Sequence, residues 1–182
     1  MPVIIGAKPE SDFSNPIGLL TDCHRRIERF LSVLVQVASD AQGRALSAGQ
    51  RASFETALRY FREAAPKHTA DEEDTLFPRL RQIDNDEARA VLAQVSALQE
   101  DHIRADCDHA EVDKLGRQWI DSGTLPVSGA ARLSTLLGEL QRMYAGHIEV
   151  EEREVFPVAA RVLAAEERLA AGKEMAERRR TK

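Results

Sequence analysis

Two eleven-residue segments of the chain carry the same pattern of residues that could bind a metal. HTADEEDTLFP occupies residues 68–78, and HIEVEEREVFP occupies residues 147–157. In a helix, a residue four positions after another lies on the same face, one turn along. The pattern therefore predicts two histidine–glutamate pairs, His68 with Glu72 and His147 with Glu151, each on one face of its helix.

Two single histidines complete this set. The separation between His24 and His68 nearly equals the separation between His102 and His147. We therefore interpret the chain as two copies of one helical hairpin. Each copy contributes a single histidine from one helix and a histidine–glutamate pair from the next.

The spacing of apolar residues indicates how these side chains are positioned. Apolar residues recur at alternating steps of four and three, and the period-two alternation of strands is rare. We expect an all-α fold, an up-down-up-down four-helix bundle with short connections. Asn15 and Pro16 resemble a helix start, and Gly43 and Gly123 are expected to end the first and third helices. Pro66 is expected to kink the second helix or loosen a turn shortly before His68.

The chain is long enough for one domain with short appendages. It has 182 residues, of which 43% are hydrophobic, enough to build one core. We interpret residues 12–165 as the bundle, residues 1–11 as an N-terminal arm and residues 166–182 as a C-terminal helical tail. The tail region is rich in alanine and glutamate, and it forms either a short fifth helix or a frayed end.

Composition argues against two classes of partner. The net charge of −5 and the short basic run at residues 178–180 argue against a nucleic-acid surface. No apolar stretch has the length of a membrane span, and the first residues lack the features of a secretory signal. We therefore expect a cytoplasmic protein without membrane association.

The four histidines are expected to meet in one layer of the bundle. Each lies on an apolar stripe, and counting the helical rise from the turns places their rings within about one turn of the same height. Glu72 and Glu151 join this layer, where an unpaired carboxylate is strongly destabilising. No lysine or arginine falls on the stripes at that level, so a metal is the obvious counter-charge. Four imidazoles and two carboxylates suit two first-row divalent ions, iron first, with manganese or zinc as alternatives.

Other known site patterns are absent. Glu-x-x-His, HExxH, GxSxG, GxGxxG and the P-loop do not occur at the relevant places. The two HxxxEExxxFP segments, with His24 and His102 upstream, instead resemble the HHE cation-binding branch of the hemerythrin family over about residues 12–160. The resemblance implies a non-haem di-iron centre with two bridging glutamates, and its ligands would be His24, His68, Glu72, His102, His147 and Glu151.

The third helix departs from the pattern of oxygen-carrying hemerythrins, which have His-x-x-x-His there and five histidine ligands. Here Asp106 lies four residues after His102, and the fifth histidine, His109, lies three residues further. Either Asp106 replaces the missing imidazole, or His109 approaches from the next layer, or neither contacts metal. Glu28 occupies the corresponding position in the first hairpin, four residues after His24. It too either contacts the metal or does not.

The second glutamate of each EE pair lies five residues after its histidine. Five residues make about 500° of an ideal α-helix, which places Glu73 and Glu152 about 140° away from the histidine direction. We therefore expect both to support a ligand or to face solvent. Some hemerythrins take their second bridge from this position, so Glu152 stays a candidate ligand.

The sequence favours a protein that binds or senses O2, NO, peroxide or iron, and no catalytic residue is assigned. A di-iron ferroxidase or peroxide-consuming enzyme is the first alternative. The second is a structural helical bundle whose polar layer is a zinc clamp or holds no metal. A homo-oligomer or an unidentified protein partner stays open.

Overall fold

The computed structural model of the chain describes residues 11–180. The predicted N-terminal arm, residues 1–11, lies outside the described residues except for its last position. Within residues 11–180 the fold is all-α and contains no strand, as predicted. None of these helices combines the length and the apolar character that a bilayer span requires.

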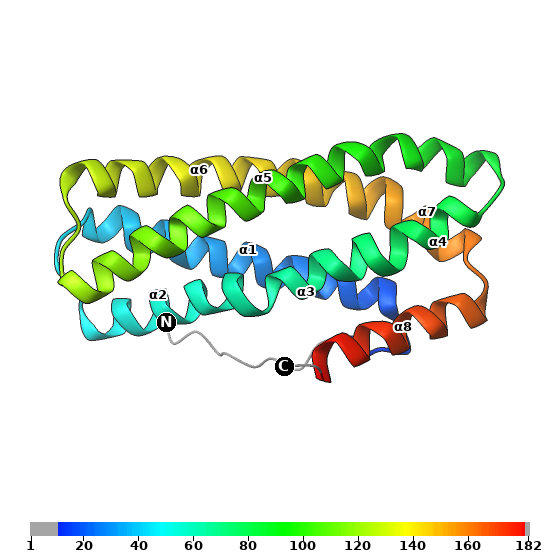
Figure 1. Ribbon diagram of the computed structural model, residues 1–182, viewed down its shortest axis with the longest axis horizontal. Helices are drawn as coiled ribbons and strands as arrows, with labels where there is room; N and C mark the ends of the chain where they lie inside the picture. Colours follow the sequence, from blue (N-terminus) through cyan, green and yellow to red (C-terminus); the bar gives the residue numbers. More distant parts are fainter. Residues whose placement is uncertain (1–10, 181–182) are drawn as a thin grey trace.

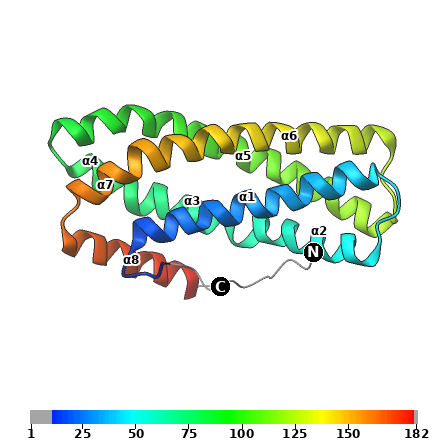
Figure 2. The ribbon, with the colours of Figure 1, turned by 180° about the vertical axis from the view of Figure 1, so that it is seen from behind.

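Four long helical segments form an up-and-down bundle, as predicted, and a further helix lies beside it (Figure 1). Two of the four segments are interrupted by a π-helical turn. In chain order the elements are α1 (Pro16–Ala41), α2 (Ala48–Glu63), α3 (Ala65–Ala70), the π turn η1 (Asp71–Leu76), α4 (Phe77–Gln82), α5 (Asp86–Ser122), α6 (Val127–Val150), the π turn η2 (Glu151–Val155), α7 (Phe156–Val162) and α8 (Ala165–Arg180). Seen from behind, α8 again lies outside the bundle, next to the beginning of α1 (Figure 2).

The predicted helix boundaries have local causes. The side-chain oxygen of Asn15 accepts a hydrogen bond from the backbone N–H of Gly18 at 3.2 Å, which caps α1. Gly43 and Gly123, with φ of 77° and 76°, follow α1 and α5 in the left-handed conformation that glycine tolerates best. The helix is interrupted at Ala64, between α2 and α3. This interruption lies directly before the first turn of α3, which contains Pro66.

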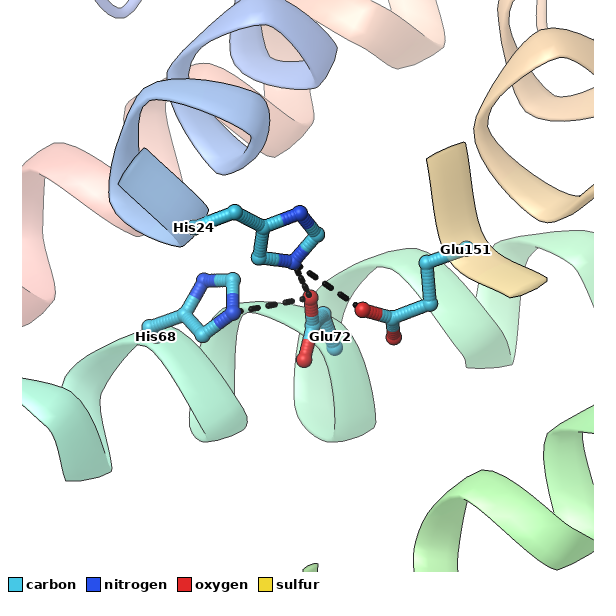
Figure 3. Close-up of side chains that lie close together, drawn as sticks. All are labelled: His24, His68, Glu72 and Glu151. Carbon is cyan, nitrogen blue, oxygen red and sulfur yellow. Dashed lines mark ion pairs between the residues drawn. The ribbon is translucent and has the colours of Figure 1, made fainter. Parts of the chain in front are cut away.

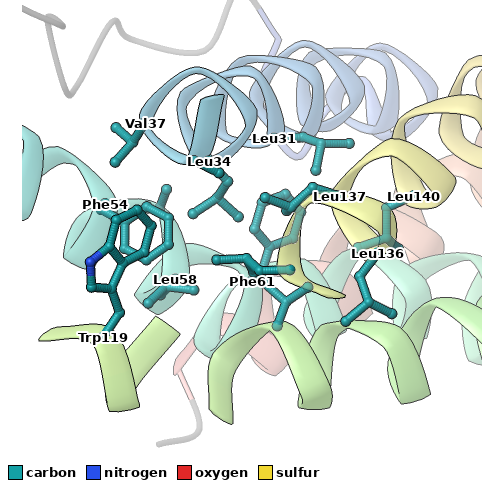
Figure 4. Close-up of a cluster of buried hydrophobic side chains, with 14 of the residues drawn as sticks. Leu31, Leu34, Val37, Phe54, Leu58, Phe61, Trp119, Leu136, Leu137 and Leu140 are labelled. Atoms are coloured by element: carbon teal, nitrogen blue, oxygen red, sulfur yellow. The ribbon is translucent and has the colours of Figure 1, made fainter. Parts of the chain in front are cut away.

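The apolar core has two parts, with the polar layer between them. His24 lies between Leu20 of the smaller cluster and Ile27 of the larger one. The larger cluster fills the half of the bundle where α2 begins (Figure 4). There the rings of Phe54 and Trp119 pack edge to face, with their centres 5.5 Å apart. Apolar packing therefore holds the helices together on both sides of the polar layer.

Leu34→Ala tests this larger cluster. Leu34 is fully buried, so its truncation leaves a cavity and should lower the free energy of unfolding by about 2–5 kcal/mol. Leu169→Ala removes the same atoms from a residue that is 51% exposed, and it should cost less than about 0.5 kcal/mol. Urea unfolding of the two variants measures the difference. Equal losses would contradict the assignment of Leu34 to the core.

Candidate metal site

The structure brings together the six residues that the sequence analysis proposed as ligands. They come from four different segments of the bundle, and each is at most 6% exposed. Figure 3 shows four of them converging, from α1, α3, η1 and η2. The six residues are His24, His68, Glu72, His102, His147 and Glu151.

Glu72 faces histidines from both hairpins. Its Oε1 lies 3.2 Å from His68 Nε2 and 3.8 Å from His24 Nε2. Its Oε2 lies 3.3 Å from Nε2 of His102, on the other side. The two oxygens of this carboxylate therefore point to two different sets of histidines.

Glu151 occupies the matching place in the second hairpin. Its Oε2 lies 3.0 Å from His24 Nε2 and 3.3 Å from His147 Nε2. The Nε2 atoms of His102 and His147 are only 3.1 Å apart. Both imidazoles therefore direct their Nε2 atom toward one point.

The donor atoms form two overlapping groups of four, and within each group all atoms lie within 4.8 Å of one another. Glu72 and Glu151 belong to both. The first group is completed by His24 and His68, and the second by His102 and His147. Among the described residues, no well-aligned hydrogen bond reaches either carboxylate. Buried carboxylates in this condition, surrounded by imidazole nitrogens, fit first-row divalent metal ions.

The π turns bring the EE pairs to the site. The N–H of Phe77 donates to the carbonyl of Glu72, and the N–H of Phe156 donates to that of Glu151. Both bonds span five residues, and the proline that follows each phenylalanine offers no N–H to continue an α-helical ladder. A π turn is wider than an α turn, so each residue advances less around the axis. The second glutamate of each pair consequently stays near the histidine face.

Each second glutamate supports a histidine of the other hairpin. Glu152 Oε1 lies 2.9 Å from His24 Nδ1, and Glu73 Oε1 lies 2.7 Å from His102 Nδ1. Glu152 also pairs with Arg25. A carboxylate on one nitrogen of an imidazole fixes the ring and leaves the other nitrogen free for a metal. The ideal-helix angle overstated how far these glutamates turn away, although a supporting role was one of the two expectations.

The remaining two histidines have no hydrogen bond at Nδ1 within the described residues. His147 Nδ1 has a carboxylate nearby, since it lies 3.5 Å from Asp101 Oδ2, a contact that the sequence pattern did not indicate. His68 Nδ1 is buried and has no hydrogen-bond partner among residues 11–180. The two halves of the site therefore share Glu72 and Glu151 but differ in what surrounds their histidines.

Two of the additional candidates lie away from this cluster. Glu28 is exposed and pairs with Arg25 at 2.7 Å, because its position on α1 points to the surface. Asp106 is also exposed and lines a cavity of about 450 Å³ between α2, α3 and α5. Neither belongs to the two donor groups, so the structure does not bring them to the site.

His109 is not brought to the site either. It follows His102 by two helical turns, about 10 Å along α5. A hydrogen bond of 3.1 Å joins His109 Nε2 and the Tyr144 hydroxyl, and the ring stacks on Phe61 at 4.2 Å. Burial lowers the pKa of His109 to about 4, which keeps this imidazole neutral in its apolar surroundings.

The carboxylates determine the protonation of the site. Burial disfavours a charged His24, but its contacts with Glu151 and Glu72 outweigh burial and raise its pKa to about 10. Burial likewise opposes a charged His102, and its contacts with Glu72 and Glu73 raise its pKa to about 9. Protons on these two imidazoles therefore balance the buried carboxylates while no metal is bound.

The pKa values of the other groups in the site shift so that His68 is neutral and both carboxylates are charged. Burial lowers the pKa of His68 to about 4, so this imidazole stays neutral. Burial raises the pKa of Glu72, but the nearby imidazoles of His68 and His102 outweigh it and lower the pKa overall. The pKa of Glu151 is also lowered, since its contacts with His147 and His24 outweigh burial and repulsion from Glu72.

The metal-free protein should lose stability as the pH rises. A histidine with a raised pKa in the folded state stabilises the fold fully below its ordinary pKa of 6.5, and this contribution disappears through a pH of about 9 to 10. Chelator-treated protein should therefore unfold at lower temperatures as the pH increases from 6.5 to 10. A variant with both His24→Asn and His102→Asn should show a much weaker dependence. An unaltered chain with a flat profile would contradict this assignment of the protons.

Comparison with known proteins agrees with this geometry. No curated protein matches the chain. The family model described as the Hemerythrin HHE cation binding domain matches residues 15–159. The matched range contains all six converging residues and most of the bundle, while α8 lies beyond it. The chain therefore belongs to the hemerythrin HHE cation-binding domain family.

Proposed function

We propose that the chain binds two iron ions at this site and uses them to bind or sense O2, NO or peroxide. The observation that carries the proposal is the sharing of Glu72 and Glu151 between two donor groups. Two ions held by separate histidine pairs and bridged by both carboxylates would use every donor in the cluster. Such a pair would also replace the protons that otherwise balance the buried charge.

The kind of donor supports iron. All six residues offer nitrogen or oxygen, and neither group contains a thiolate. When bound, a pair of ferrous ions can supply one electron each to a small oxidant. The surrounding side chains keep bulk water away: the Phe156 ring, for example, stacks on His24 with ring centres 5.3 Å apart.

A groove borders one residue of the second donor group, His147. It lies between α5 and α6, has a volume of about 770 Å³, and includes His147 and Asp101 in its lining. Gly146 also lines it, in a position where a side chain would meet nothing within 4 Å. The width of this groove at Gly146 favours the approach of a small ligand to His147.

The expected cytoplasmic location and a further protein partner stay predictions.

Metal analysis and optical spectra test the proposal. Iron-loaded protein should contain two iron ions per chain and show near-ultraviolet and visible bands that change with oxygen. Glu72→Gln should lower the iron content to one ion or fewer, because it removes a donor shared by both groups. Asp106→Asn should retain two, since Asp106 is exposed and outside the groups.

The rival functions give different results in the same experiment. A single zinc ion, or no metal, would support the structural alternative and contradict the di-iron proposal. Turnover of ferrous iron or peroxide without a stable oxygen-dependent spectrum would favour the enzyme alternative. An unaltered iron content in Glu72→Gln would show that the bridging role is wrong.

The supporting glutamates give a separate prediction. Glu73→Gln and Glu152→Gln should each weaken iron binding by about 10- to 100-fold, because each holds the ring of a proposed ligand. Glu154→Gln is a matched control, since Glu154 lies in the same π turn as Glu152 but is exposed. Competitive titration against a chelator of known affinity measures the changes. If all three variants bind iron with the same affinity, Glu73 and Glu152 do not support the site.

A further inference from the structure

The repeated segments differ at the position before their EE pairs. The first has Asp71 there and the second has Val150. Asp71 is fully buried, directly next to the proposed ligand Glu72. A buried carboxylate needs a partner, so this difference calls for an explanation that the proposed metal site does not supply.

The partners of Asp71 come from α8. Its Oδ2 lies 2.5 Å from Arg179 Nη2, and its Oδ1 pairs with Arg178. Arg178 also donates to the hydroxyl of Thr75 at 3.2 Å, near the end of η1. Two guanidinium groups of α8 therefore hold both ends of the π turn that carries Glu72 and Glu73.

A second set of contacts joins α8 to the same region. Arg79 of α4 pairs with Glu174 at 2.7 Å and with Glu167 at 3.2 Å, both on α8. The same guanidinium donates to the carbonyl of Thr75 at 2.9 Å. The backbone at the end of η1 is thus tied to α8 through Arg79 as well.

The other face of α8 is closely docked. A Cβ atom on Gly172 would lie 1.8 Å from the backbone oxygen of Phe13, so only glycine fits there. Met175 is fully buried in the smaller core cluster, and the Arg179 guanidinium lies 5.5 Å from the centre of the Phe13 ring. In both views of the ribbon, α8 lies along the half of the bundle that contains η1 and the beginning of α1 (Figures 1 and 2).

We propose that α8 is a latch that holds η1 in its π-helical geometry and so positions Glu72 and Glu73. The latch lies beyond residues 15–159, the range that the family model matches, and the Asp71 carboxylate that it engages has no counterpart at Val150. It acts on the first repeat and leaves η2 to its own contacts. Asp71, Arg178 and Arg179 are positioning residues, since none belongs to the donor groups.

Hydrogen exchange of the metal-free chain tests the latch without reference to metal. The amides of Phe77 and Phe156 make equivalent hydrogen bonds, to the carbonyls of Glu72 and Glu151, and so form an internal control. In a variant with both Arg178→Gln and Arg179→Gln, the Phe77 amide should exchange at least about tenfold faster, while Phe156 changes little. Arg180→Gln, at an exposed position of the same helix, should leave both rates unchanged.

A second variant releases α8 without altering any charge. Gly172→Ala introduces a backbone clash with Phe13, although alanine would otherwise favour the helix. It should also accelerate exchange at Phe77 but not at Phe156. Gly49→Ala, at a helix position with open space around it, is the control and should change neither rate. If Phe77 is unaffected in both latch variants, or if both phenylalanines respond equally, the latch is overturned.

The consequence for metal binding rests on the function proposed above. Under anaerobic conditions, the Arg178→Gln/Arg179→Gln variant should bind ferrous iron at least about tenfold more weakly than the unaltered chain. Arg178→Lys/Arg179→Lys keeps the charges and should recover part of the affinity. Faster exchange at Phe77 with unchanged iron affinity would overturn the positioning role. If the unaltered chain binds no iron but Phe77 responds as expected, the latch holds and the proposed function fails.

Discussion

Two carboxylates buried at the centre of an apolar bundle impose the main constraint on this structure. Glu72 and Glu151 are fully inaccessible to water, and leaving either unpaired would be strongly destabilising. Imidazoles from both hairpins surround each of them. Each glutamate has an imidazole of its own hairpin and one of the other hairpin within 3.3 Å. The polar layer therefore joins the two repeats, in addition to the apolar clusters on either side of it.

The π turns reconcile this constraint with the helical backbone. An α-helix directs only one residue of an adjacent pair toward a given point, yet both glutamates of each EE pair serve the site. The five-residue hydrogen bonds from Phe77 and Phe156 widen the turn where this is needed. The phenylalanine then fills the core, and the proline removes the donor that would restore α geometry. The repeated segment thus encodes a backbone distortion together with the histidine and glutamate that we propose as ligands.

Helical periodicity explains why much of this could be predicted. Apolar stripes indicate the helices, and counting residues from the turns places four histidines at one height, as the structure finds. The same reasoning assumed α geometry after His68, so it misjudged the direction of Glu73. Contacts between distant residues without periodicity, such as Asp71 with Arg178, left no pattern to find. His109 shares a face with His102, but a shared face does not place two residues in the same layer.

The approximate symmetry of the site makes its differences informative. The half that contains His102 and His147 borders the α5–α6 groove, and Asp101 lies at both the groove and the His147 ring. The opposite half contains His68, which has no carboxylate contact at Nδ1 within the described residues, and α8 packs against the π turn that follows it. The groove thus borders the second donor group, whereas α8 contacts η1, which carries the shared Glu72 and the Glu73 that contacts His102. Because Glu72 belongs to both donor groups and Glu73 contacts His102, the proposed latch would also affect the half that borders the groove, although no residue of α8 lines that groove.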